Sequence, residues 1–158
     1  MKSVLIAAAA LALVPFVAFG QAEEVLVDEA PKTRTVLGLE GPAAPFGFGV
    51  EVLGVVPLDD QIDGMAGWNL RTRRVTFAPG GIAPLHPHVR RPTLFYIVEG
   101  EVFEHRSDNE EPQLHKAGDA VATKHNVAHW WKNETDTPTI VIATDIVSDE
   151  ELSLGKSE

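Results

Sequence analysis

The chain has no cysteine among its 158 residues. It can therefore form no disulfide, thiol nucleophile or cysteine-ligated metal site, so any metal must be held by histidine, carboxylate or another oxygen donor. Positive charge is scarce as well, because 13 Lys and Arg face 23 Asp and Glu and the formal net charge is -10. This balance disfavours partners that are bound through phosphates, so we expect neither a nucleic acid nor an anionic membrane surface as partner.

Long hydrophobic runs are absent from the sequence except at its beginning, where residues 4–19 are apolar. This run is shorter than the roughly 20 residues that span a bilayer, and it contains Pro15. It follows one positive charge and precedes small residues, which predicts a secretory signal peptide over residues 1–22 and no membrane anchor after cleavage. We expect a periplasmic or secreted protein. The residues that define this pattern are Met1, Lys2, Gly20 and Ala22.

Long stretches of helical periodicity are also missing from the rest of the sequence. Short β-prone runs alternate with turn-forming residues, which predicts about eight strands in an antiparallel barrel or jelly roll. We expect a single all-β domain over residues 50–147, preceded by an N-terminal arm over 23–49 and followed by an acidic, solvated tail over 148–158. The expected strands are 50–56, 70–77, 84–88, 93–98, 101–106, 119–122, 129–132 and 139–147.

His86 and His88 stand two residues apart in a β-prone segment, so the strand pleat sends both imidazoles to the same face. Such a pair is compatible with metal binding, and equally with two partly exposed polar residues. The surrounding residues resemble the two motifs of the cupin family, G-x5-H-x-H-x(3 or 4)-E-x6-G and G-x5-P-x-G-x2-H-x3-N. The matching positions are Gly80, His86, His88 and Gly100 in the first motif, and Gly118, His129 and Asn133 in the second.

This resemblance implies a small jelly-roll barrel in which His86, His88 and His129 bind one divalent metal ion. It also implies a homodimer formed by strand exchange, for which the N-terminal arm is available. The sequence departs from the motifs at Thr93, which replaces the ligand glutamate, and at Lys124 and Asn126. A threonine is a poor metal ligand, so we expect a three-histidine site, similar in ligand set to cupins that oxidise thiols at iron. The competing interpretation is a barrel that has lost its metal.

Three further residues, in addition to Thr93, are expected near this site. Phe95 shares the strand parity of Thr93 and should line the cavity. His125 precedes His129 by four residues and is a candidate to support the metal ligands. Of Trp130 and Trp131, one should face inward, and we include Trp130 among the substrate-contacting candidates.

Two further expectations concern charge at the site. We interpret Arg90 and Arg91 as a solvated turn. No carboxylate has the parity and reach to act as a general base inside the barrel, so the sequence assigns no catalytic residue.

The sequence therefore favours an exported mononuclear metalloenzyme that acts on a small organic molecule. A dioxygenase with Fe(II) is our first expectation, and Zn, Ni, Mn and Cu are compatible with the same ligands. A metal-dependent isomerase or lyase would use the same residues. The alternative from another class is a non-catalytic periplasmic protein that binds a small molecule or a metal, and a purely structural domain is the third.

Overall fold

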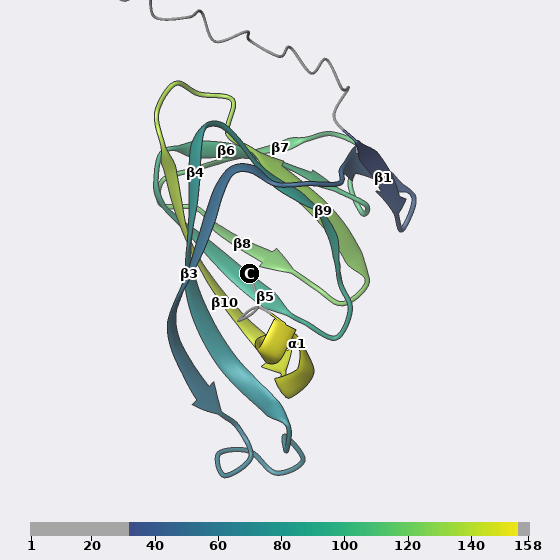
Figure 1. The fold of residues 1–158 in the computed structure, drawn as a ribbon, viewed down its shortest axis with the longest axis vertical. Coiled ribbons are helices and arrows are strands. Elements are labelled where there is room, and N and C mark those ends of the chain that lie inside the picture. Colours follow the sequence, from purple (N-terminus) through teal and green to yellow (C-terminus); the bar gives the residue numbers. More distant parts are fainter. Residues whose placement is uncertain (1–31, 155–158) are drawn as a thin grey trace, which may run out of the picture.

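The computed structural model describes residues 32–154, so the predicted signal peptide and the first part of the predicted arm lie outside the described residues. Within them the chain forms ten strands and one short helix (Figure 1). The strands are β1 (Thr33–Val36), β2 (Leu39–Pro42), β3 (Phe46–Pro57), β4 (Trp68–His88), β5 (Thr93–Glu99), β6 (Glu101–Arg106), β7 (Gln113–Lys116), β8 (Ala120–Thr123), β9 (Val127–Lys132) and β10 (Thr139–Ser148). The helix is α1 (Asp149–Leu154).

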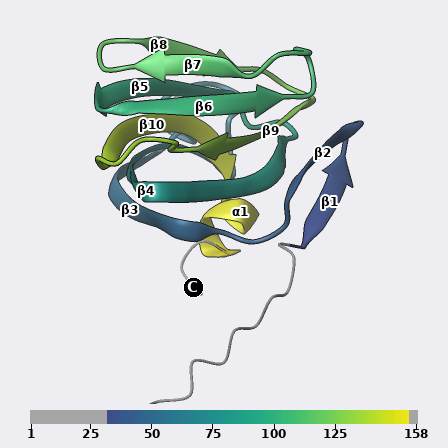
Figure 2. The same ribbon diagram turned by 90° about the horizontal axis from the view of Figure 1, so that it is seen from above.

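All strand pairs are antiparallel, and β4 joins the two halves of the barrel. Its first half pairs with β3 and β10, and its second half pairs with β9. One half then continues from β10 to β5 and β8, and the other from β9 to β6 and β7. Figure 2 shows the long strands β3 and β4 curving around one side of the barrel, with β10, β5 and β8 following above them. The expected antiparallel jelly-roll architecture is confirmed.

A bend divides β4 where the sequence predicted a turn between two separate strands. Gly80 adopts a φ of 71°, a backbone conformation that costs glycine little free energy and costs most other residues considerably more. At Gly81 an added Cβ would lie 2.6 Å from the carbonyl oxygen of Gly47. The two glycines therefore let one continuous strand change direction, which places its last residues across the barrel from its first.

The core follows the alternation of the strands. On β5 the side chains of Thr93, Phe95 and Ile97 are buried, whereas Leu94 and Tyr96 are exposed. Burying a large apolar side chain contributes about 1.5 to 3 kcal/mol, so this inward row is a main source of stability. The central cluster consists of Val75, Phe77, Ala83, Phe95, Ile97, Val102, Val121, Trp131, Val141 and Ala143.

Several elements differ from the expected boundaries. Part of the expected arm forms the hairpin of β1 and β2, and β3 begins at Phe46 rather than at residue 50. The segment expected as a solvated tail includes α1, whose first turn is capped by Ser148: its hydroxyl oxygen accepts a hydrogen bond from the Glu151 amide at 3.3 Å. Asp149 also accepts a hydrogen bond from the Asn69 amide at 2.7 Å, which fastens the helix to β4. Across residues 32–154, no helix is long and apolar enough to cross a membrane.

Candidate metal centre

Three histidines converge inside the barrel from two neighbouring strands. His86 and His88 lie at the end of β4, and His129 lies on β9, directly opposite His86 in the strand register. The Nε2 atom of His88 is 3.0 Å from that of His129 and 3.3 Å from that of His86, and the third side of the triangle measures 3.2 Å. The pleat and the register of two adjacent strands thus suffice to bring the three rings together.

Each imidazole is held from behind by an oxygen acceptor. His86 Nδ1 lies 2.9 Å from the Pro84 carbonyl oxygen, and His88 Nδ1 lies 2.9 Å from the Arg91 carbonyl oxygen. His129 Nδ1 lies 2.5 Å from Oε1 of Glu104. Because these oxygens are acceptors, they favour the tautomer with the proton on Nδ1, which turns an unprotonated Nε2 toward the other two rings. At His129 the indole N–H of Trp131 also lies 3.0 Å from Nδ1, but the shorter contact to the carboxylate favours the same tautomer.

Three lone pairs that face one another repel, and a cation between them would remove that repulsion. For metal–nitrogen bonds of about 2.1 Å, ligands at right angles lie about 3.0 Å apart and tetrahedral ligands about 3.4 Å apart. The Nε2 separations of 3.0–3.3 Å fall within this range. Among the described residues, these histidines are the group of His, Asp and Glu side chains that could hold a metal ion. The donor set fits a divalent transition metal.

The electrostatic surroundings keep these ligands neutral. Burial, followed by the charge that His129 carries when protonated, lowers the pKa of His86 to about 3 and that of His88 to about 2. Burial also lowers the pKa of His129, although the neighbouring Glu104 opposes this effect. Neutral imidazole is the form that binds metal, so near neutral pH no proton competes for Nε2.

Glu104 is a buried carboxylate inside the barrel, where we expected no carboxylate with the parity and reach of a general base. Glu104 lies on β6 between Val102 and Arg106, all three of which face inward. Burial would raise its pKa, but hydrogen bonds from His115 and His129, together with the charge of Arg106, lower it to about 2. Glu104 touches His129 on Nδ1, so it orients a metal ligand and does not replace the missing one. The inward parity of Val102 was the signal that could have identified it.

Thr93 supports the site from behind His88. Its hydroxyl oxygen lies 3.0 Å from His88 Nδ1, and the hydroxyl donates to the Arg91 carbonyl oxygen at 3.3 Å.

The expected solvated turn is correct for Arg90, which is exposed and lies over the Trp68 ring. It is wrong for Arg91, whose Nη2 lies 3.4 Å from His88 Nε2. Because Arg91 follows the tight turn after β4, its side chain folds back over the histidines.

A small cavity of about 50 Å³ adjoins the histidines. Phe95 lines it, as do His86 and His129. The remaining lining residues are Phe48, Arg73, Val75, Phe77, Ala83, Trp131 and Val141. The cavity is therefore mostly apolar, with one guanidinium group in its wall.

Two residues expected at the site lie elsewhere. Trp130 faces away from the cavity and stacks on His105 at a ring separation of 3.7 Å, so Trp131 is the inward residue of the pair. The β9 pleat decides this, because Trp131 has the parity of His129. His125 is exposed, and its Nδ1 accepts a hydrogen bond from the Arg90 amide at 3.1 Å. It lies in the turn after β8, where Asn126 has a φ of 60° and directs the chain into β9.

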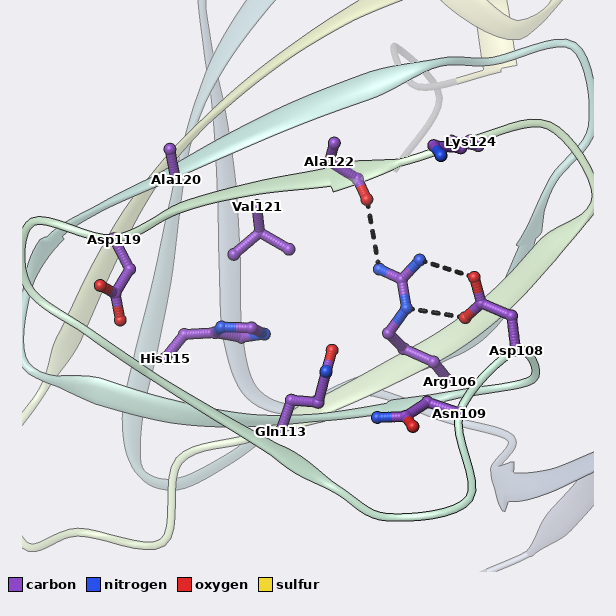
Figure 3. A pocket seen from close by; sticks show the side chains of 10 residues that line it. All are labelled: Arg106, Asp108, Asn109, Gln113, His115, Asp119, Ala120, Val121, Ala122 and Lys124. Carbon is purple, nitrogen blue, oxygen red and sulfur yellow. Dashed lines mark hydrogen bonds and ion pairs between the residues drawn. The ribbon is translucent and has the colours of Figure 1, made fainter.

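A larger, open cavity of about 560 Å³ is lined by residues of β6, β7 and β8 and of the turns beside them (Figure 3). Arg106 bridges it, donating hydrogen bonds to Asp108 and to the Ala122 carbonyl oxygen. His115 also lines this cavity, and its Nε2 lies 2.9 Å from Oε2 of Glu104. Glu104 thus lies between His129 and His115, and each of its two oxygens contacts one of these histidines.

Comparison with known proteins supports the assignment of the fold. Residues 73–145 match the family model described as "Cupin domain", and this range includes all three histidines. The chain is 31% identical over 99 residues to germin-like protein subfamily 2 member 1 of Arabidopsis thaliana, covering 61% of this chain and 44% of that protein. It is 26% identical over 87 residues to germin-like protein 5-1 of Oryza sativa subsp. japonica, covering 53% and 39%. The chain thus spans less than half the length of these relatives.

Solved structures show the same fold at low sequence identity. KdgF from Halomonas sp. aligns with a TM-score of 0.52 and 18% identity, covering 66% of this chain and 85% of that chain. An oxalate oxidase aligns with a TM-score of 0.50 and 22% identity, covering 65% and 52%. At these identities the similarity concerns the barrel alone.

Proposed function

We propose that this chain, which belongs to the cupin family by the match of residues 73–145, is an exported mononuclear metalloenzyme. It oxidises a small organic molecule at the centre formed by His86, His88 and His129. The observation that carries the proposal is the convergence of three unprotonated Nε2 atoms beside a cavity. The apolar run over residues 4–19, within the predicted signal peptide over residues 1–22, supports export to the periplasm or the outside of the cell.

The ligand count favours catalysis over a structural role. Structural sites are usually closed by four protein ligands, whereas catalytic sites keep a position for substrate. Within residues 32–154, no fourth His, Asp or Glu joins the three histidines. When bound, iron or copper would supply one-electron and dioxygen chemistry, and zinc would supply Lewis-acid chemistry.

The cavity lining favours oxidation over isomerisation or elimination. An isomerase or lyase needs a group that takes a proton from the substrate. Among the described residues that line the cavity there is no Asp or Glu, and Glu104 is occupied by its contacts to two histidines. The chain's own residues instead bind the metal, orient the ligands, and exclude water through Phe77, Phe95 and Trp131. The oxalate oxidase among the structural relatives is an example of oxidation chemistry in this fold.

Metal analysis tests the proposal. The protein should be purified without a histidine tag or chelator and analysed for bound metals by mass spectrometry. We expect about one metal ion per chain in the natural protein and far less in His129→Ala. The matched control is His105→Ala, because His105 stacks on Trp130 outside the cavity and should leave the metal content unchanged.

A second measurement separates an enzyme from a binding protein. In the cobalt- or copper-loaded protein, azide should change the visible spectrum if the metal keeps an open position. An unchanged spectrum would favour the alternative, a non-catalytic metal-binding or small-molecule-binding protein. A chain that retains none of Fe(II), Zn(II), Ni(II), Mn(II) or Cu(II) would overturn the proposed function altogether.

A further inference from the structure

Arg73 introduces a positive charge into the wall of the cavity beside the histidines. Its side chain is only 15% exposed, and its Nη2 donates to Oδ2 of Asp145 at 3.0 Å. Its Nε is buried and has no hydrogen-bond acceptor among the described residues. A buried, charged N–H group without an acceptor is costly, so an acceptor supplied from outside the chain would stabilise this arrangement.

Asp145 alone does not neutralise this charge, because it is shared. Arg71 contacts both of its oxygens, with Nε 3.0 Å from Oδ1 and Nη2 2.7 Å from Oδ2. Arg91 is a third guanidinium within electrostatic reach of Asp145, and its Nε is also buried without an acceptor among residues 32–154. The second nearby carboxylate is that of Glu151 on α1. Three guanidinium groups therefore face two carboxylates, next to three neutral imidazoles.

The charge on Arg73 persists at neutral pH. Burial lowers its pKa to about 10, although the attraction of Asp145 opposes this effect. A guanidinium N–H is a directional donor whose preferred partner is a carboxylate or phosphate oxygen. A metal dication on the histidines would add positive charge beside it, so the electrostatic preference is for an anion.

The remaining walls restrict what can carry that anionic group. They come from apolar and aromatic side chains, among them Phe48, Phe95 and Trp131. A ligand that fits must therefore present one charged end to Arg73 and an apolar body to these rings. The volume of about 50 Å³ limits that body to a few carbon atoms. A carboxylate is planar and smaller than a phosphate, so it matches both the donor and the space.

We propose that Arg73 is a specificity-determining residue, and that its Nε binds the carboxylate group of a small, otherwise apolar organic acid beside the three-histidine centre. The proposal deepens the proposed function, since it rests on that centre for the assignment of the acid as substrate. The binding of the carboxylate itself depends on Arg73 and the cavity walls.

Binding of propionate tests this proposal. The dissociation constant is measured by ligand-observed NMR on the zinc-loaded protein, and the zinc content is determined in the same samples. Propionamide, which has nearly the same shape and no charge, serves as the matched ligand. We expect Arg73→Gln to raise the dissociation constant of propionate by about tenfold or more. Propionamide should bind the natural protein no more tightly than propionate binds Arg73→Gln.

Arg74→Gln is the control variant. Arg74 is the next residue of β4, but its side chain is 48% exposed on the opposite face and pairs with Glu51. It should leave the dissociation constant of propionate unchanged. Arg73→Gln should retain its zinc and its circular dichroism spectrum, because Arg71 still binds Asp145 through two hydrogen bonds.

The outcomes separate this proposal from the proposed function. Equal binding of propionate by the natural protein and Arg73→Gln, or equal binding of propionate and propionamide, overturns the role of Arg73 while the metal centre stands. A natural protein that binds no metal overturns the proposed function, and the same comparison on metal-free protein then decides about Arg73. If Arg73→Gln does not fold, Arg73→Lys decides, because it keeps the charge without the Nε donor: we expect several-fold weaker binding, and unchanged affinity overturns the proposal.

Discussion

Glu104 Oε1 lies 2.5 Å from Nδ1 of His129, on the side of the ring opposite the nitrogen that faces His86 and His88. The contact joins β6 to β9 and fixes both the orientation and the protonation of one of the three converging imidazoles. The other oxygen of the same carboxylate lies 2.9 Å from His115 at the edge of the open cavity. A single buried side chain thus connects the metal centre to the polar surface behind it.

Replacing Glu104 by glutamine should weaken metal binding. The amide keeps the shape but loses the negative charge that strengthens His129 as a ligand, so we expect metal affinity to fall by about 10- to 100-fold. Competition with a chelator of known affinity measures this change. Glu101→Gln is the control, because Glu101 lies on the same strand with a side chain 38% exposed, paired with Lys116. Equal metal affinity in both variants would contradict the role of Glu104.

Replacing Thr93 by valine should have a smaller effect on the same property. Valine fills the space but removes the hydroxyl next to His88 Nδ1, while the Arg91 carbonyl oxygen remains as its acceptor. We expect metal affinity to fall several-fold and the free energy of unfolding to change by about 1 kcal/mol. Chelator competition and urea unfolding measure the two quantities, with the exposed Thr76→Val as control. A loss as large as that of Glu104→Gln would mean that Thr93 acts on the metal more directly.

The metal-free protein should lose stability as the pH falls below neutral. The pKa values of His86 and His88 are lowered to about 3 and about 2 in the folded chain, mainly by burial. The unfolded chain therefore takes up protons first, below about pH 6.5, and stability that is complete above this pH falls as the pH approaches the folded values. Each histidine contributes a slope of at most about 1.4 kcal/mol per pH unit.

Urea unfolding of chelator-treated protein between about pH 7 and pH 5 measures this slope. In His86→Gln the slope should be shallower, because one of the three buried histidines with a lowered pKa is gone. In His125→Gln it should be unchanged, because His125 is exposed. Stability that is independent of pH over this range would contradict the burial of neutral imidazoles.

Replacing Asn133 by alanine should destabilise the barrel without acting on the metal ligands. The fully buried Asn133 amide nitrogen donates to the Thr137 and Ala78 carbonyl oxygens at 2.7 and 3.1 Å, and its oxygen accepts from the Thr135 amide at 2.9 Å. Their loss leaves buried backbone groups unsatisfied, so we expect the free energy of unfolding to fall by about 2 to 4 kcal/mol. Denaturant unfolding measures this, with the exposed Asn109→Ala as control. An unchanged free energy of unfolding would show that the hydrogen bonds of Asn133 do not stabilise the turn over residues 133–137.

Local rules of strand geometry account for what could be predicted. The pleat places His86 and His88 on one face, and it places Phe95 inward and Tyr96 outward. The same rule could have placed Arg73 inward, since it shares the parity of Val75 and Phe77 on β4. Of the adjacent Trp130 and Trp131, the pleat alone shows only that one faces inward. The inward position of His129 on β9 decides that it is Trp131.

Turns limited the prediction for a different reason. The glycines at 80 and 81 indicated a break in the chain, and only the packing of β3 against them shows that β4 continues through a bend. Arg91 follows a turn in which Arg90 has a φ of 57°, and its direction depends on that single conformation. One turn thus sends two adjacent arginines to opposite surroundings.

The sequence by itself determined the antiparallel all-β class and the shared face of His86 and His88, because strand periodicity is a property of the local backbone. It assigned His129 to the same site only through the resemblance to the cupin motifs. Only the tertiary structure decided the charges around them. Glu104 meets His129 through the register of β6 on β9, and Arg73 meets Asp145 through that of β4 on β10. Registers of this kind join residues 25 and 72 positions apart. They are set by the packing of the whole barrel, which no local pattern contains.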